Sequence, residues 1–288
     1  MTAVPTVAAF FDPATHTVSY VVSDPHTGQA AIIDPVLDFT AHNARTATRS
    51  ADLLLAHLAD KELELAWILE THAHADHLSA AHYLRERTGA PVVIGAQIVA
   101  VQSIFAKLFE ADDVAPDGNQ FDRLVAEGDR LPLGELEFRV LHTPGHTPAC
   151  VSYLIGDAAF VGDTLFMPDY GTARCDFPGG SAATLYGSIR KLLALPPETQ
   201  IFVGHDYLPA GRSDFAWQST VAEQHRANVH VHDGVSEADF VAMRQARDET
   251  LEAPQLILPS LQVNIRAGQL PPPSNGGQRY LKLPLNAI

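Results

Sequence analysis

A dense group of histidine and acidic residues follows an apolar stretch near residue 70. The segment THAHADH places His72, His74, Asp76 and His77 within six positions, directly after the apolar segment AWILE. Imidazole nitrogens bind zinc or iron, and a carboxylate adds a hard, charge-compensating ligand. The residue types and their spacing therefore indicate a metal site at the end of a short buried strand.

Three later apolar segments end in the same residue types. EFRVLHTPG leads to His146, AAFVG leads to Asp163, and IFVG leads to His205. Residues at strand ends are held by a rigid sheet and remain reachable from solvent, as a metal site with an open position requires. A single histidine after a strand is more often a capping or surface residue, but four such segments together favour a metal centre.

The candidate ligands fit one metal ion or two. A first cluster could contain His72, His74 and His146. A second could contain Asp76, His77 and His205, with Asp163 between the two clusters. The glycine before each of the last three ligands is consistent with tight turns in the backbone.

Short strands and amphipathic helices are expected to hold these segments. Period-two patterns and turn residues predict two groups of strands: Val7–Phe11, Thr17–Val22, Ala30–Ile33, Ala66–Glu70 and Pro91–Ala96, then Arg130–Pro132, Leu136–Leu141, Cys150–Ile155, Ala158–Val161 and Ile201–Val203. Helical spacing predicts helices over Ala51–Leu63, Leu78 to Gly89, Gln97–Glu110 and Ala182–Leu195 (capped by Ser181), and from a Ser236–Asp239 capping box to about Leu251. These two mixed groups indicate a layered, pseudo-duplicated α/β (α+β) fold.

Length and composition predict one folded domain over residues 1–288, with a C-terminal extension from about residue 252 that includes the loop Pro271–Gly277. The net charge of −15 argues against nucleic-acid binding and against anionic membrane surfaces. No secretion signal or long apolar run is evident, and two cysteines cannot form a disulfide framework. We therefore expect a cytoplasmic protein without a membrane partner, which could form a homodimer.

The ordered motifs THAHADH, TPGHT, GDTLF and GHDY resemble the metallo-β-lactamase superfamily. The resemblance implies a four-layer αββα sandwich with the metal site at one edge of its two sheets. ARCDF, with Arg174, Asp176 and Phe177, resembles the bacterial type of persulfide dioxygenase, also called sulfur dioxygenase. HDY at His205–Tyr207 and LQVNIRAG at Leu261–Gly268 resemble the same family. Mitochondrial members carry a cysteine where this chain has Arg266-Ala267-Gly268, so the role of that thiol does not carry over.

This resemblance implies one Fe(II) per chain, held by His72, His146 and Asp163. It implies that glutathione persulfide, O2 and water are converted to sulfite and glutathione. The remaining histidines and the acid of the motifs would orient ligands or water near the iron, or fill a second metal position: His74, Asp76, His77 and His205.

Further roles follow from the same resemblance. Tyr207 would donate a hydrogen bond near the sulfur or the oxygen, with His205 and Asp76 as further catalytic candidates. Arg174 and Arg266 would bind the carboxylates of glutathione. The simpler interpretations are an internal salt bridge from Arg174 to Asp176 and a surface position for Arg266.

Two other functions compete with this one. A thioester hydrolase of the hydroxyacylglutathione type would use two zinc ions or mixed metals that share Asp163. All seven ligand positions for that site are present, although the sequence has neither a G-C-G-x-F-x-E-G-like stretch nor an HEY-like motif. A non-catalytic binding protein on the same scaffold is disfavoured, because no ligand is missing.

Overall fold

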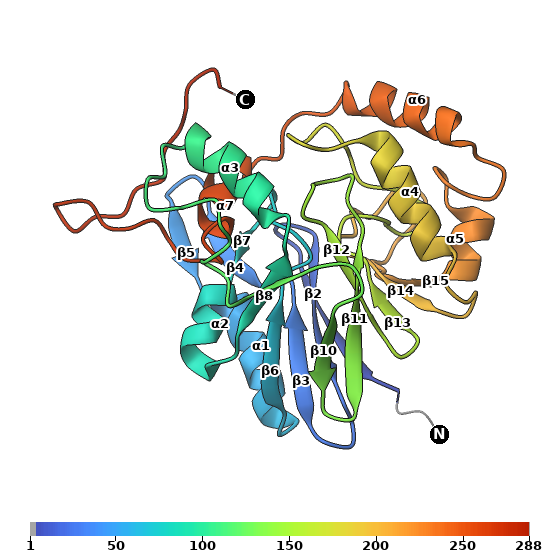
Figure 1. Cartoon of the computed structure of the whole chain (residues 1–288), viewed down its shortest axis with the longest axis horizontal. Coiled ribbons are helices and arrows are strands. Elements are labelled where there is room, and N and C mark those ends of the chain that lie inside the picture. Colours follow the sequence, from blue (N-terminus) through green and yellow to red (C-terminus); the bar gives the residue numbers. More distant parts are fainter. Residues whose placement is uncertain (1–3, 288) are drawn as a thin grey trace.

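Two six-stranded β-sheets form the centre of the protein in the computed structural model, which describes residues 4–287 (Figure 1). The first sheet has the order β1 (Thr6–Asp12), β2 (Thr17–Ser23), β3 (Gln29–Ile33), β6 (Glu64–Leu69), β8 (Val92–Gly95) and β9 (Arg123–Val125). The second has the order β10 (Arg130–Leu133), β11 (Leu136–His142), β12 (Val151–Ile155), β13 (Ala158–Phe160), β14 (Gln200–Phe202) and β15 (Gln218–Thr220). A small third sheet has the order β5 (Arg45–Ala47), β4 (Val36–Thr40) and β7 (Leu78–Ser79).

Helices cover the outer face of each large sheet (Figure 1). On the first sheet lie α1 (Arg49–Asp60), α2 (Ala81–Thr88), α3 (Ile98–Leu108) and α7 (Ile257–Asn264). On the second lie α4 (Ala182–Leu193), α5 (Val221–Ala227) and α6 (Glu237–Asp248). Separate apolar clusters fill each helix–sheet contact and the space between the sheets. This arrangement confirms the expected four-layer αββα sandwich.

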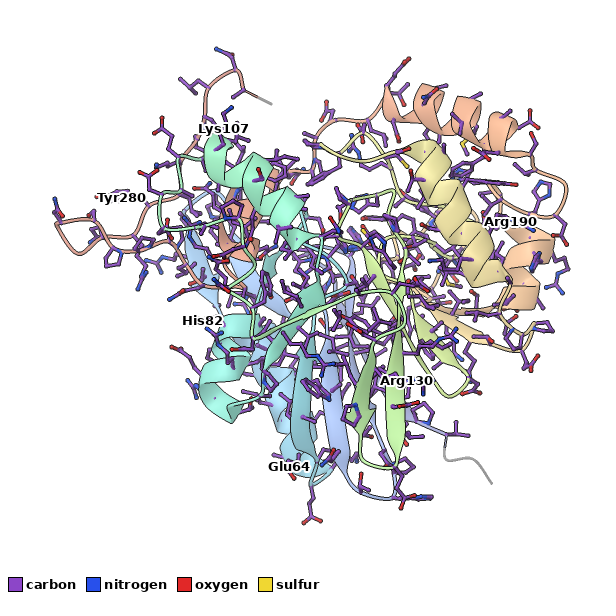
Figure 2. The ribbon with its side chains drawn as sticks, in the orientation of Figure 1. Glu64, His82, Lys107, Arg130, Arg190 and Tyr280 are labelled. Atoms are coloured by element: carbon purple, nitrogen blue, oxygen red, sulfur yellow. The ribbon has the colours of Figure 1, made fainter. Side chains whose placement is uncertain are left out.

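The centre of the sandwich combines apolar packing with a few internal hydrogen bonds, and its side chains fill the space between the ribbons (Figure 2). The buried Tyr20 hydroxyl donates to Val203 O at 2.6 Å, and the Tyr153 hydroxyl donates to Glu70 O at 3.0 Å. Both bonds link one sheet to a segment that follows a strand of the other. They satisfy hydroxyls that would otherwise be costly to bury.

Parallel strand pairs bring several strand ends to one edge. The pairs β3–β6, β6–β8, β8–β9 and β13–β14 are parallel, and each is connected through a helix. Parallel strands joined in this way end at the same edge of a sheet. The four ligand-bearing segments follow β6, β11, β13 and β14, as their apolar patterns predict.

The structure differs from the predicted elements in both strands and helices. The short strands β4, β5, β7, β9 and β15 are absent from the sequence prediction, and Leu78–Ser79 forms β7, so α2 begins at Ala81 rather than at Leu78. Helix α1 ends at Asp60 rather than at Leu63, because Glu62 adopts a left-handed backbone with φ of 54°. Two short helices, α5 and α7, are absent from the sequence prediction. Helix α5 begins with a reciprocal capping box between Thr220 and Glu223, and α7 is an apolar helix without a capping side chain. Within residues 4–287, no helix combines the length and apolar character that a membrane span requires.

Candidate metal centre

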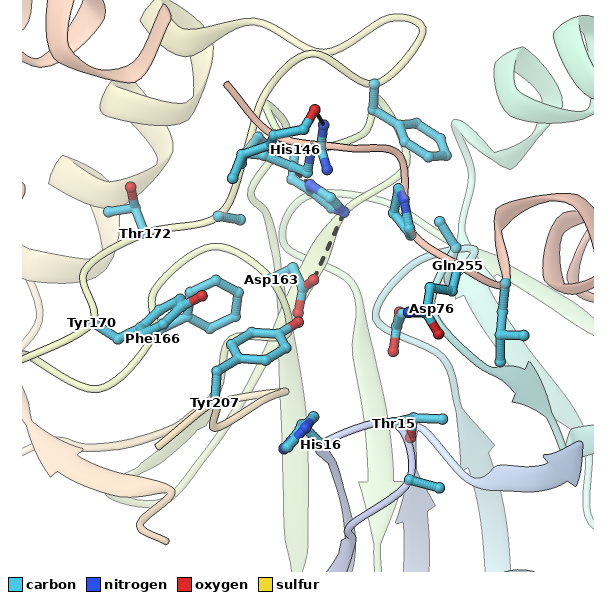
Figure 3. Close-up of a pocket in the computed structure, with 18 of the residues that line it drawn as sticks. Thr15, His16, Asp76, His146, Asp163, Phe166, Tyr170, Thr172, Tyr207 and Gln255 are labelled. Atoms are coloured by element: carbon cyan, nitrogen blue, oxygen red, sulfur yellow. Dashed lines mark hydrogen bonds and ion pairs between the residues drawn. The ribbon is translucent and has the colours of Figure 1, made fainter. Parts of the chain in front are cut away.

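Three predicted ligands converge at the edge shared by the two sheets. Donor atoms of His72, His146 and Asp163 all lie within 4.8 Å of one another. Figure 3 shows His146 and Asp163 facing each other across the site. Asp163 Oδ2 is 4.0 Å from His72 Nε2 and 3.8 Å from His146 Nε2. These separations are too long for hydrogen bonds, but donors that each lie about 2 Å from one metal ion are spaced in this range.

Several buried donor atoms at this edge have no hydrogen-bond partner among the described residues: His72 Nε2, His77 Nε2, His205 Nε2 and Asp163 Oδ1. Buried polar atoms are normally paired, because an unpaired one loses its hydration without compensation. Burial also lowers the pKa of His72 well below its usual value. The neutral imidazole is the form that binds metals, so the residues fit a metal ion.

Hydrogen bonds outside the cluster orient two of the donor rings. The Thr71 hydroxyl donates to Asp34 Oδ2 at 2.7 Å and lies 3.0 Å from His72 Nδ1, from which it can accept. His146 Nδ1 donates to Arg174 O at 2.8 Å. In both rings the Nδ1 contact leaves Nε2 directed at Asp163. Such partners fix the tautomer and the orientation of a metal-binding histidine.

A second group of donors contains His74, Asp76 and His205. His205 Nε2 lies 3.3 Å from Asp163 Oδ1 and 3.5 Å from Asp76 Oδ2, so this group adjoins the first through Asp163. His77 lies beside it, with Nδ1 3.1 Å from Asp76 Oδ2. The His74 ring also lies beside His72, with centroids 4.0 Å apart, so His74 adjoins both donor groups, and the predicted division of the donors into two clusters stays a prediction.

Two buried carboxylates explain the position of His74. Its Nε2 lies 3.1 Å from Asp34 Oδ1 and 3.3 Å from Glu70 Oε2. Burial opposes a charged ring, but the adjacent carboxylates outweigh it and raise the pKa of His74 well above its usual value. The ion pair therefore holds the Nε2 side of the ring against the two acids, while the ring itself lies beside His72.

A cavity of about 740 Å³ opens onto the donor atoms (Figure 3). Phe166, Tyr170 and Tyr207 form an aromatic wall, and the Tyr207 hydroxyl points toward Asp163. The Tyr207 ring stacks on His205 with centroids 5.6 Å apart. Burial raises the pKa of Tyr207 well above its usual value, so its hydroxyl stays protonated and can donate a hydrogen bond.

The two predicted substrate arginines lie in different places. Arg174 lines the metal cavity, but it forms two contacts of 2.6 Å with Asp176 and donates to Glu252 O, as its simpler interpretation anticipates. Arg266 is only 6% exposed, binds Asp113 and lines a separate cavity of about 360 Å³. The expectation of a surface position for Arg266 is wrong, and the metal cavity does not include it.

Asn264 of α7 positions the loop that carries the first ligands, a role that the sequence analysis does not anticipate. Its side-chain amide donates to His74 O and His77 O, and its oxygen accepts from Ser79 N, each at 2.8 Å. The segment LQVNIRAG contains this residue, so its family resemblance is the available signal. The bonds span more than 180 residues of sequence, which no local pattern reveals.

Replacing Asn264 with alanine is expected to destabilise the fold and weaken metal binding. Loss of three buried hydrogen bonds should lower the free energy of unfolding by about 3 kcal/mol, at about 1 kcal/mol per bond. Urea unfolding with metal titration would measure both effects. Asn119→Ala is the matched control, because Asn119 is exposed and its side chain bonds only to Asp117 among the described residues. A loss of stability no larger than that of the control would contradict the role of Asn264.

Comparison with known proteins places this geometry in a family. A model of the metallo-beta-lactamase superfamily matches residues 12–205. A probable metallo-hydrolase from Burkholderia pseudomallei is 56% identical over 294 residues, covering 98% of this chain and all of that protein. Glyoxylase B2 from Dictyostelium discoideum is 50% identical over 271 residues, covering 93% of this chain and 92% of that protein. The chain spans 65% of a longer Beta-lactamase hydrolase-like protein from Xylella fastidiosa, which is 54% identical over 284 residues.

Persulfide dioxygenases are more distant relatives. The mitochondrial persulfide dioxygenase ETHE1 of Mus musculus is 31% identical over 267 residues, covering 92% of this chain and 89% of that protein. The crystal structure of ETHE1 from Myxococcus xanthus matches with a TM-score of 0.74 and 34% identity, covering 92% of this chain and all of that one. The family model, the fold and the donor groups agree: the chain belongs to the metallo-beta-lactamase superfamily and is a metal-dependent enzyme.

Proposed function

We propose that this enzyme is a persulfide dioxygenase that oxidises glutathione persulfide at a single Fe(II). The outer sulfur of the persulfide loses four electrons to O2, and water supplies the third oxygen, which gives sulfite and releases glutathione as the thiol. The supporting observation is the compact set of His72, His146 and Asp163. Two histidines and one carboxylate on one face, with the other positions open, are typical of non-haem Fe(II) oxygenases.

The chain's own residues prepare the site for this substrate. A cavity of about 740 Å³ can hold a tripeptide thiol, and its aromatic wall supplies apolar contact surface. A bound Fe(II) would supply adjacent positions for the sulfur and O2 and the capacity for electron transfer. His205 and Asp76 border the site, with 3.5 Å between His205 Nε2 and Asp76 Oδ2, and we propose that they orient water.

Tyr207 is proposed to donate a hydrogen bond to the persulfide. Tyr207→Phe removes only the hydroxyl, so we expect kcat to fall about tenfold and KM to change little. A tenfold fall corresponds to the loss of about 1.4 kcal/mol of stabilisation that is present only in the transition state. Oxygen-electrode kinetics would measure both parameters. Tyr280→Phe is the control, because Tyr280 is 65% exposed and lies outside this cavity. Equal kcat values for Tyr207→Phe and the wild type would reject this role.

A thioester hydrolase with two metals is the alternative, and one observation favours it. The second donor group of His74, Asp76 and His205 adjoins Asp163, whose two oxygens face different groups. A carboxylate in that position can bridge two metals. Relatives named glyoxylase B2 and probable metallo-hydrolase agree with hydrolysis.

Metal analysis of the purified enzyme separates the two functions. The proposed dioxygenase should contain one iron per chain and leave a hydroxyacylglutathione thioester intact. Two zinc ions per chain, with rapid hydrolysis of that thioester, would instead support the hydrolase.

We also propose a cytoplasmic location, which is supported by Cys150 and Cys175, both buried and free of disulfides.

A further inference from the structure

One wall of the metal cavity comes from a segment outside the superfamily match. The six donor residues of the two metal groups lie within residues 12–205, which the family model matches. The C-terminal wall contributes other cavity residues: Arg244, Arg247, Leu251, Pro254, Gln255 and Leu256. Substrate selectivity can therefore be set in this wall, separately from the metal ligands.

Helix α6 holds this wall firmly against the site. The guanidinium of Arg244, which is 1% exposed, donates to Asp248 Oδ1 at 2.9 Å and to Thr172 O at 3.1 Å. Asp248 Oδ2 accepts from the backbone N–H of Cys175 at 2.8 Å. These bonds tie α6 to the segment that also contains Arg174, whose backbone carbonyl accepts a hydrogen bond from His146 Nδ1. The position of α6 relative to the metal ligands is therefore fixed by buried hydrogen bonds.

Arg247 is the cavity arginine that remains unpaired. It is exposed and lies one turn after Arg244 on α6. Arg174 and Arg244 have carboxylate partners at 2.6 Å and 2.7 Å, whereas no described carboxylate within residues 4–287 forms an ion pair with Arg247. Arg247 nevertheless lines the metal cavity. Nearby, burial lowers the pKa of His230 to about 4, and the charges of Arg244 and Arg247 add to this shift.

We propose that Arg247 binds a carboxylate of the thiol carrier and so selects glutathione over uncharged persulfides. This inference rests on the proposed function and names the residue that recognises its substrate. An unpaired guanidinium is a strong carboxylate ligand, and it is the local attraction that an anionic substrate needs in a chain with a net charge of −15. Leu251, Pro254 and Leu256 give the same wall apolar surface for the aliphatic part of the peptide.

Calorimetric binding of two unreactive probes tests the proposal. The probes are S-methylglutathione and its diethyl ester, which lacks both free carboxylates. The intact enzyme should bind the acid at least tenfold more tightly than the diester. Arg247→Ala should weaken binding of the acid about tenfold and of the diester less than twofold, as expected for the loss of one partly exposed charge-assisted contact. Arg190→Ala, an exposed arginine of α4 outside the cavity, removes the same charge and should leave both affinities unchanged (Figure 2).

The same variants separate this inference from the proposed reaction. In oxygen-uptake assays, Arg247→Ala should raise KM for glutathione persulfide about tenfold with kcat nearly unchanged. Oxygen uptake in the intact enzyme with an unchanged KM in Arg247→Ala would overturn the inference alone. A second outcome is that the intact enzyme prefers the acid, that Arg247→Ala loses this preference, and that no variant consumes oxygen. This outcome would reject the dioxygenase and keep the role of Arg247. An intact enzyme that binds acid and diester equally, or neither of them, would overturn the inference.

Discussion

Asp163→Asn should deprive the enzyme of its metal and reduce oxygen-consuming turnover by at least ~1000-fold. The reason is that the several kcal/mol by which a bound metal stabilises the transition state would be lost. Asp163 is the single carboxylate of the three-donor set, and its oxygens face His72, His146 and His205 at 3.3–4.0 Å. An asparagine keeps the shape of the side chain but removes the negative charge. The remaining neutral imidazoles then lack the hard ligand that compensates a divalent cation.

Metal content and oxygen uptake of Asp163→Asn measure this effect directly. Asp169→Asn is the matched control, because Asp169 is an exposed acid six residues away that binds Arg212. That control should retain its metal and nearly all its activity. Full metal content and wild-type turnover in Asp163→Asn would remove the basis for the proposed metal set.

Gly145→Ala should destabilise the fold by at least ~3 kcal/mol, because backbone strain and overpacking each cost 1–3 kcal/mol. Gly145 has φ of 136°, and an added Cβ would lie 2.4 Å from the backbone N and Cα of Leu185 in α4. The Gly145 carbonyl also accepts from the N–H of Ser181, the N-cap of that helix, at 2.8 Å. The clash would displace the turn that carries His146, so metal affinity should fall as well.

Gly187→Ala provides the matched control on the same helix. An added Cβ at Gly187 has no heavy atom within 4 Å, and its backbone is helical. Alanine there should raise the free energy of unfolding by about 0.5–1 kcal/mol, through its better helix propensity. Urea unfolding would compare the two variants. Equal stabilities for Gly145→Ala and the wild type would show that the turn before His146 tolerates a side chain.

Local sequence patterns account for much of the fold. Each predicted ligand follows a short apolar segment, and the structure places strands β6, β11, β13 and β14 at those segments. Ser181 caps α4 as predicted, since its side chain accepts from Thr184 N. These features depend on residues close in sequence, so periodicity and capping rules reveal them. The family resemblance adds the four layers, which local patterns alone do not specify.

Long-range contacts decide the details that sequence reasoning misses. The orientation of His74 depends on Asp34, whose carboxylate comes from the segment after β3. Arg266 is withdrawn from the metal cavity by Asp113, 153 residues earlier in the chain. Arg247 reaches the metal cavity only because Arg244 and Asp248 attach α6 to residues 172–175. None of these pairings has a signature in a short stretch of sequence.

Oxygen uptake by the iron-loaded enzyme with glutathione persulfide is the most direct test of the proposed function. The balanced reaction requires one O2 consumed and one sulfite formed for each persulfide, in parallel with negligible hydrolysis of a hydroxyacylglutathione thioester. We expect this stoichiometry from the intact enzyme and neither oxygen uptake nor sulfite from Asp163→Asn. Absence of oxygen uptake by the intact, iron-loaded enzyme, together with rapid thioester hydrolysis, would contradict the proposed function.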